Sequence, residues 1–101
     1  MSNRTSLQAT LERILGSRNV YYQPPESVKI TYPAIVYSRD DVVSQHADDM
    51  KYIHTNRYEI IVIDKRPDNE AIDKILELPL SSFNRHYTAD NLNHDVLTLY
   101  Y

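Results

Sequence analysis

Two histidines and two aspartates lie close together near the middle of the chain, in a combination that suits metal binding. His46, Asp48, Asp49 and His54 could offer imidazole nitrogens and carboxylate oxygens, which are common ligands of divalent metals. They fall around the tip of an expected β-hairpin, where ligand geometry is poorly fixed and where polar residues serve solvation. We therefore expect no metal site here, and no cofactor anywhere in the chain.

A second group of histidines and aspartates flanks the last turn of the sequence. His86, Asp90, His94 and Asp95 could pair as a general base and the residue that orients it. His94 and Asp95 are neighbours on an expected strand, so their side chains point to opposite faces and cannot act together. We expect turn and cross-strand hydrogen bonds from this group rather than catalysis.

Several common catalytic arrangements are excluded by composition. The chain has no cysteine, which removes thiol nucleophiles, disulfides and thiolate metal sites. It has one glycine, so neither a P-loop nor a glycine-rich dinucleotide motif can be present. A non-enzymatic protein is the expectation, with a small enzyme or ligand-binding domain as the weakest alternative.

Length and charge limit the remaining classes. The 101 residues correspond to one domain, spanning 1–101. A net charge of −3 without a basic cluster is unlike the surface of a protein that binds nucleic acid tightly. No apolar run is long enough for a membrane span or a signal peptide, so we expect no membrane partner and synthesis in the cytoplasm.

The first element is expected to be an amphipathic helix. Thr5 and Gln8 have the spacing of a capping box, and Gly16 stands where a helix C-cap belongs. The apolar residues between them repeat at helical spacing: Leu7, Leu11, Ile14 and Leu15.

Strands dominate the rest of the sequence. A short extended piece at 19–22 precedes β-branched and aromatic runs at 33–41, 52–64, 81–89 and 94–101. A second helix is expected to begin at Pro67 and to stop before Pro79. We predict an α+β fold: a mostly antiparallel sheet of four main strands, two helices packed on one face, and a long projecting β-hairpin formed by the first two main strands.

Two helices can cover only one face of such a sheet. The runs "IIVI" (60–63) and "VLTLYY" (96–101) nevertheless place apolar side chains on both faces. We expect copies of the chain, or a partner, to cover the second face. The alternative is that the loop before the first main strand folds over it through Val28, Ile30 and Tyr32.

Tyrosine is strongly over-used, with nine tyrosines against one phenylalanine and no tryptophan. Tyrosine is favoured at protein interfaces, because it is an apolar ring with a polar tip. It is also an ordinary strand aromatic. Both interpretations stay open at this point.

Four aspartates flank the tip of the long hairpin: Asp40, Asp41, Asp48 and Asp49. In a monomer they would form a solvated end. In a ring they would recur around the axis and form a negative collar past which DNA slides.

The whole chain resembles the tail terminator, or tail completion, proteins of long-tailed bacteriophages. The resemblance rests on the N-terminal amphipathic helix, on "YPAIVY" (32–37) opening a long hairpin, on "RYEIIVIDK" (57–65) leading into an acidic-capped helix, and on the closing hairpin. It implies a virion protein that forms a ring, typically of six copies, at the head-proximal end of the tail. Such a ring ends polymerisation of the tail tube and presents the surface to which the head docks.

The same resemblance implies the partners: further copies of the chain, the tail tube protein with the sheath as an additional candidate, head–tail connector proteins, and DNA that passes without specific binding. A head–tail connector or stopper protein of the phage neck is the alternative, since it would be of similar size, would also form a ring and would occupy the same part of the virion.

The chain closes on "NHDVLTLYY" (93–101), whose apolar residues are expected to divide between the subunit core and a neighbouring copy. We place the subunit interface at six residues: Tyr52, Tyr58, Leu97, Leu99, Tyr100 and Tyr101.

Overall fold

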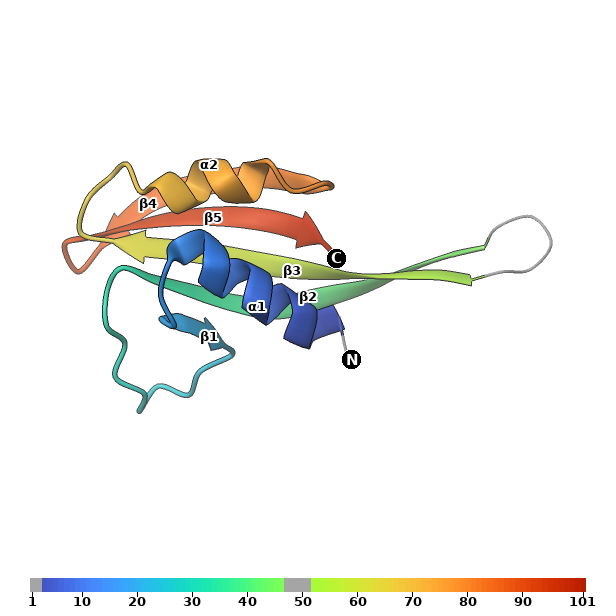
Figure 1. Ribbon diagram of the computed structural model, residues 1–101, viewed down its shortest axis with the longest axis horizontal. Coiled ribbons are helices and arrows are strands. Elements are labelled where there is room, and N and C mark those ends of the chain that lie inside the picture. Colours follow the sequence, from blue (N-terminus) through green and yellow to red (C-terminus); the bar gives the residue numbers. More distant parts are fainter. Residues whose placement is uncertain (1–2, 47–51) are drawn as a thin grey trace.

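A computed structural model describes residues 3–46 and 52–101, with side chains over 4–40 and 56–101. The described residues form an α+β domain with two helices and one sheet (Figure 1). The elements follow the order α1 (Asn3–Leu15), β1 (Val20–Tyr22), β2 (Ala34–His46), β3 (Tyr52–Asp64), α2 (Glu70–Leu76), β4 (Ser81–Ala89) and β5 (Leu92–Tyr100).

The sheet has five strands rather than the expected four, in the order β1-β2-β3-β5-β4. β1 pairs parallel with β2 and the other pairs are antiparallel, so the sheet is mixed. The short piece at 19–22 joins the sheet because Ile35 N donates to Asn19 O and Gln23 N donates to Tyr37 O. Three residues are too few for the sequence pattern to reveal which strand they pair with.

The first hairpin pairs β2 with β3 from Ala34–Ile63 out to His46–Tyr52, with a bulge between Arg39 and Asp41. β5 pairs with β3 only from Arg57 inward. Among the described strands, the outer halves of β2 and β3 therefore pair only with each other.

The second hairpin is closed by a two-residue turn, Asp90–Asn91, rather than by the four residues 90–93 that separate the two strands expected from the sequence. Both residues have positive φ angles, 53° and 61°, as a type I′ turn requires. Asn and Asp tolerate that conformation better than other side chains.

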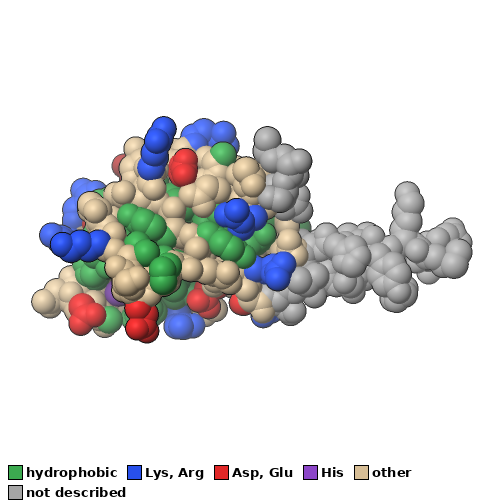
Figure 2. All heavy atoms as spheres, turned by 90° about the horizontal axis from the view of Figure 1, so that it is seen from below, with side chains coloured by type: hydrophobic (Ala, Val, Ile, Leu, Met, Phe, Trp, Pro, Cys, Tyr) green, Lys and Arg blue, Asp and Glu red, His purple; other side chains and the backbone are tan. Residues whose placement is uncertain are grey.

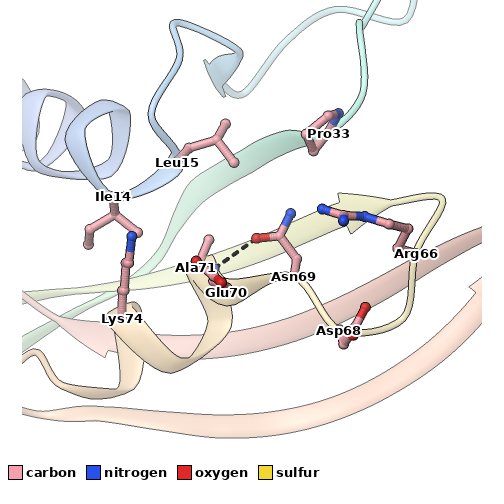
Figure 3. A pocket seen from close by; sticks show the side chains of 9 residues that line it. All are labelled: Ile14, Leu15, Pro33, Arg66, Asp68, Asn69, Glu70, Ala71 and Lys74. Carbon is pink, nitrogen blue, oxygen red and sulfur yellow. Dashed lines mark hydrogen bonds between the residues drawn. The ribbon is translucent and has the colours of Figure 1, made fainter.

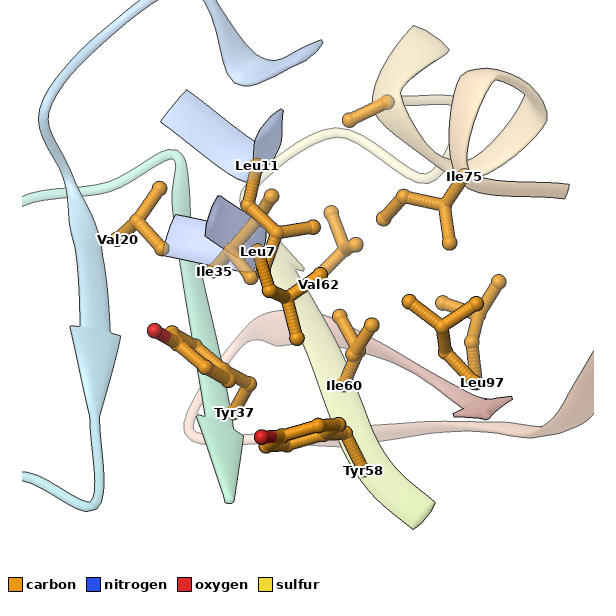
Figure 4. Close-up of a cluster of buried hydrophobic side chains, with 12 residues drawn as sticks. Leu7, Leu11, Val20, Ile35, Tyr37, Tyr58, Ile60, Val62, Ile75 and Leu97 are labelled. Atoms are coloured by element: carbon orange, nitrogen blue, oxygen red, sulfur yellow. The ribbon is translucent and has the colours of Figure 1, made fainter. Parts of the chain in front are cut away.

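Both helices pack on one face of the sheet, as predicted (Figure 4). α1 contributes Leu7 and Leu11, and α2 contributes Ala71 and Ile75. The sheet contributes alternate residues of its strands, because side chains of one face recur every second residue. These sheet residues are Val20, Ile35, Tyr37, Tyr58, Ile60, Val62, Leu97 and Leu99.

The predicted α1 stripe is confirmed, and so is its end at Gly16, whose φ of 77° is in the left-handed region that glycine favours. The predicted capping box is wrong, since α1 begins at Asn3 and contains both Thr5 and Gln8. Gln8 instead ties the helix to the sheet. Its Nε2 donates to Val20 O over 3.0 Å, and its Oε1 accepts a hydrogen bond from the Tyr37 hydroxyl.

The start of α2 differs from the prediction at Pro67. The helix begins at Glu70, and Asn69 is its N-cap, with Oδ1 accepting from Ala71 N over 2.8 Å. The buried carboxylate of Asp64 holds the preceding loop, accepting from Asn69 Nδ2 over 2.8 Å and from Arg66 N over 3.2 Å. Side-chain capping therefore overrides the proline signal.

Four of the nine tyrosines lie in the layer between α1 and the sheet, which supports the strand-aromatic interpretation for them. The rings of Tyr22 and Tyr37 are 4.9 Å apart, and those of Tyr37 and Tyr58 are 6.1 Å apart. Burial raises the pKa of Tyr37 above its ordinary value. Tyr101 packs against the same cluster, and its hydroxyl is 2.9 Å from Ser6 Oγ.

Neither described helix is long and apolar enough to cross a membrane.

Candidate functional site

The most exposed apolar side chains of the described residues gather around β4. Five large hydrophobic residues are exposed, and four of them fall between residues 76 and 87. We call these four the β4 edge: Leu76 (40% exposed), Leu80 (69%), Phe83 (48%) and Tyr87 (37%). Phe83 lies on the helix face, opposite Leu97, whereas Tyr87 lies on the other face, opposite His94. The β4 edge therefore exposes apolar side chains on both faces of the sheet, and exposed apolar side chains that gather in one part of a molecule can mark an interaction surface.

β4 is exposed because it is the last strand of the sheet and pairs only with β5 among the described strands. All of its residues from Ser82 to Thr88 are exposed, whichever face they point to. This edge is interrupted by a bulge between Phe83 and Arg85, and Arg85 adds a positive charge to it. Such features protect an edge strand from uncontrolled pairing, so the side chains of the edge, rather than its backbone, are the candidate contact.

Leu80 combines exposure with backbone strain. Its φ of 62° lies in the left-handed region, which costs a leucine about 1–2 kcal/mol. It follows Pro79, which ends the segment after α2, and Tyr100 N donates to its carbonyl over 3.2 Å. An exposed, strained leucine brings no apparent benefit to its own fold, and strained residues of this kind gather at functional sites.

The face of the sheet opposite the helices is less open than expected. Val36 and Ile61 are half-buried there, and Ile63 and Val96 are buried. Each is flanked by side chains from neighbouring strands; Val96, for example, lies between Ile61 and Arg85. The apolar surface to be covered is therefore concentrated at the β4 edge.

The connection from β1 to β2 runs beside β1 at the opposite edge of the sheet (Figure 1). Figure 2 views the molecule from this side, where hydrophobic side chains reach the surface among Lys, Arg, Asp and Glu side chains. Val28 is 36% exposed, while Ile30 and Tyr32 are half-buried.

The predicted interface needs correction at three residues. Tyr58, Leu97 and Leu99 are 2%, 0% and 0% exposed, because they point toward the helices and form the core. Their side chains cannot reach a neighbouring copy while the domain is folded.

The side chains of the two terminal tyrosines lie on opposite faces of the sheet. Tyr101 is half-buried on the helix face, and its backbone N donates to Asn56 O over 2.9 Å. Tyr100 is half-buried on the opposite face and pairs with Arg57 of β3. Of these two, only Tyr100 stays suited to an intermolecular contact. The side chain of Tyr52 lies outside the described residues.

Of the predicted acidic collar, only Asp40 has a described side chain. Its Oδ1 accepts a hydrogen bond from Arg57 Nε over 2.9 Å, and both side chains are about one third exposed. The positive charge of Arg57 therefore offsets the negative charge of Asp40. The side chains of Asp41, Asp48 and Asp49 lie outside the described residues.

The expected cross-strand hydrogen bond is present in the His–Asp group. His86 and Asp95 are directly opposite on β4 and β5, and His86 Nδ1 is 2.7 Å from Asp95 Oδ1. His94 points to the other face, where its ring stacks on Tyr87 at 4.6 Å. Asp90 belongs to the turn.

Among the residues whose side chains are described, no group of three or more His, Cys, Asp or Glu side chains is placed to hold a metal ion. The side chains of His46, Asp48, Asp49 and His54 lie outside these residues.

Hollows lie beside the helices in the part of the chain that the structure describes. One, of about 290 Å³, lies between the end of α1, the start of β2 and the start of α2 (Figure 3). Arg66, Asp68, Glu70 and Lys74 give it mixed charge. Another, of about 380 Å³, is a groove between α1 and α2. Sequence reasoning missed this groove, since it arises from the packing of two helices that are far apart in the chain.

A scan against models of protein families, a search of curated proteins and a search of solved structures found no match for this chain.

Proposed function

We propose that this protein is a non-enzymatic virion protein of a long-tailed bacteriophage: a tail terminator that forms a ring, of six copies, at the head-proximal end of the tail. The ring ends polymerisation of the tail tube and presents the surface to which the head docks. The phage assignment rests on the resemblance carried by "YPAIVY" (32–37), "RYEIIVIDK" (57–65) and the closing hairpin.

The β4 edge is the observation that carries the assembly part of the proposal. A 101-residue chain that leaves Leu76, Leu80 and Phe83 each at least 40% exposed in one segment gains little from them as a monomer. Covering apolar surface contributes roughly 25 cal/mol for each Å² removed from water. Contact between copies at this edge would recover that free energy.

The outer halves of β2 and β3 support a second contact. They pair only with each other among the described strands, so they can act as an arm that projects from the body and reaches a neighbouring copy. In the ring, Asp40 and the other aspartates of this hairpin would face the axis, where negative charge keeps DNA moving past without binding it.

Electron microscopy of tails made with and without this protein tests the function. We expect tails of uncontrolled length in its absence, because nothing would stop the tube from growing. Tails of normal length that fail to join heads would instead identify a head–tail connector. Normal, infectious particles would contradict both roles.

A further inference from the structure

The hollow of about 290 Å³ is bordered by segments that are distant from one another in the sequence. The end of α1 supplies Ile14 and Leu15, and the residue before β2 supplies Pro33. The start of α2 and the loop before it supply the rest of the lining (Figure 3). A volume of this size is at the lower limit of ligand pockets, so it suits a molecule about as large as an amino acid.

Hydrogen bonds fix the backbone on both sides of the hollow. Asn69 Oδ1 accepts from Ala71 N, and Asn69 Nδ2 donates to the buried carboxylate of Asp64, each over 2.8 Å. On the opposite side, Asn19 Nδ2 donates to Pro33 O over 3.3 Å. A hollow whose walls are already ordered loses little conformational entropy when a ligand binds.

Four charged side chains line the hollow, two of each sign: Arg66, Lys74, Asp68 and Glu70. Among the described residues, only Arg66 of these four forms an ion pair, with 3.9 Å between its Nε and Asp64 Oδ2. Glu70 and Lys74 are four residues apart on α2, at the spacing and in the order in which such charges pair most readily. They do not pair here, so the hollow presents both charges to a ligand.

The two cations reach the hollow from different sides. In Figure 3, Lys74 extends toward Ile14, whereas Arg66 extends toward Asn69. Ile14 and Leu15 are half-buried and pack against the core, so they form a fixed apolar wall beside Lys74. A short aliphatic group can rest on this wall while its charged neighbours pair with the side chains of α2.

The mixed charge excludes several classes of ligand. A simple anion would meet the carboxylates of Asp68 and Glu70, and a simple cation would meet the two positive charges. A wholly apolar ligand would remove charged groups from water without pairing them, which is costly. A ligand that carries both charges avoids each of these penalties.

We propose that the hollow binds a zwitterionic group with a short aliphatic side chain, as presented by a free aliphatic amino acid or by a peptide with neighbouring opposite charges. The ammonium of the ligand pairs with Glu70 and its carboxylate with Lys74, which completes the ion pair that α2 leaves unformed. The aliphatic side chain packs on Ile14 and Leu15. This binding is separate from the contacts between copies in the proposed ring.

Amide chemical shifts of the protein, measured during titration with leucine and its blocked forms, test the assignment. We expect leucine to bind with a dissociation constant on the order of 1 mM, as suits a small and open hollow. It should bind about 2- to 5-fold more tightly than N-acetylleucine or leucinamide, each of which lacks one of the two charges.

Two variants assign the charges to their partners. Glu70→Gln should abolish the advantage of leucine over N-acetylleucine, and Lys74→Gln should abolish its advantage over leucinamide. Glu26→Gln and Lys29→Gln are the matched controls, since both residues are exposed and lie in the connection from β1 to β2. Neither control should change the binding of leucine.

A tripeptide of lysine, leucine and glutamate, blocked at both ends, distinguishes the sources of the ligand. Tighter binding of leucine identifies a free amino acid, and tighter binding of the tripeptide identifies a segment of a partner protein. The inference is overturned if neither compound shifts the resonances of residues around the hollow, or if leucine and its two blocked forms bind equally well. Neither of these results bears on the tail-terminator role, which the microscopy of tails tests independently.

Discussion

β4 and β5 are partners in one hairpin and have the same length, but they differ completely in burial. In β5, Asp95, Val96, Leu97 and Leu99 are buried, whereas β4 is exposed from Ser82 to Thr88. The difference follows from position, because β5 lies between β3 and β4 while β4 ends the sheet. The inner strand stabilises the fold, and we propose that the edge strand contacts other molecules.

The largest expected contrast is between two residues that face each other across the hairpin. Leu97 and Phe83 are paired in register and point to the same face, yet Leu97 is fully buried and Phe83 is 48% exposed. Leu97→Ala should cost about 2–5 kcal/mol of unfolding free energy because it leaves a cavity. Phe83→Ala should cost less than about 1 kcal/mol. Urea denaturation of both variants measures the difference, and equal losses would refute the division between the strands.

Removing the hydrogen bond between His86 and Asp95, which links β4 to β5, should give the next largest loss of unfolding free energy. His86→Ala leaves the buried Asp95 carboxylate without its described partner, which should cost about 1–3 kcal/mol. A double-mutant cycle with Asp95→Ala isolates the pair, since removing both groups should cost less than the sum of the single changes. Strict additivity would show that the two side chains do not interact.

The end of β5 offers a smaller test of which residues belong to the core. Tyr101→Phe removes only the hydroxyl that contacts Ser6, so we expect a loss of about 0.5–1.5 kcal/mol. Tyr100→Phe, on the other face, is the matched control and should have no measurable effect on unfolding. A larger effect from Tyr100→Phe would reverse the assignment of the two terminal tyrosines.

The smallest change in unfolding free energy is expected at the Asp40–Arg57 ion pair, which lies between β2 and β3 and is partly exposed. Asp40→Asn should change the unfolding free energy by less than about 1 kcal/mol, because both Asp40 and Arg57 are partly exposed to solvent. The difference from the natural chain should shrink further in high salt. An effect that is large and independent of salt would show that the pair is more deeply buried than described.

The hydrophobic pattern predicted the main elements well. The second strand of the long hairpin begins and ends where it was placed, at Tyr52 and Asp64, because β-branched and aromatic residues are continuous there. The start of α2 was missed, since the caps that set it depend on Asp64, five residues before Asn69 and on another element. The pairing of β1 could not be predicted either, because it depends on contacts with residues that are distant in the sequence.

The exposed apolar surface at β4 was the least predictable feature. The sequence places apolar residues in both "SSFNRHYTA" (81–89) and "HDVLTLYY" (94–101), and only strand order decides which hairpin strand is buried. A signal was present: Ser82, Asn84 and Arg85 make β4 polar on both faces, which is typical of an edge strand. Apolar content alone favoured Leu97 and Leu99, which belong to the core.

Sedimentation of the natural chain beside Leu80→Gly and Leu97→Ala tests the central claim most directly, that the β4 edge joins copies while β5 holds the fold. The natural chain should sediment as a ring, Leu80→Gly as a folded monomer, and the folded fraction of Leu97→Ala still as a ring. A natural chain that stays a compact monomer at every concentration, or a Leu80→Gly variant that assembles normally, would contradict the claim.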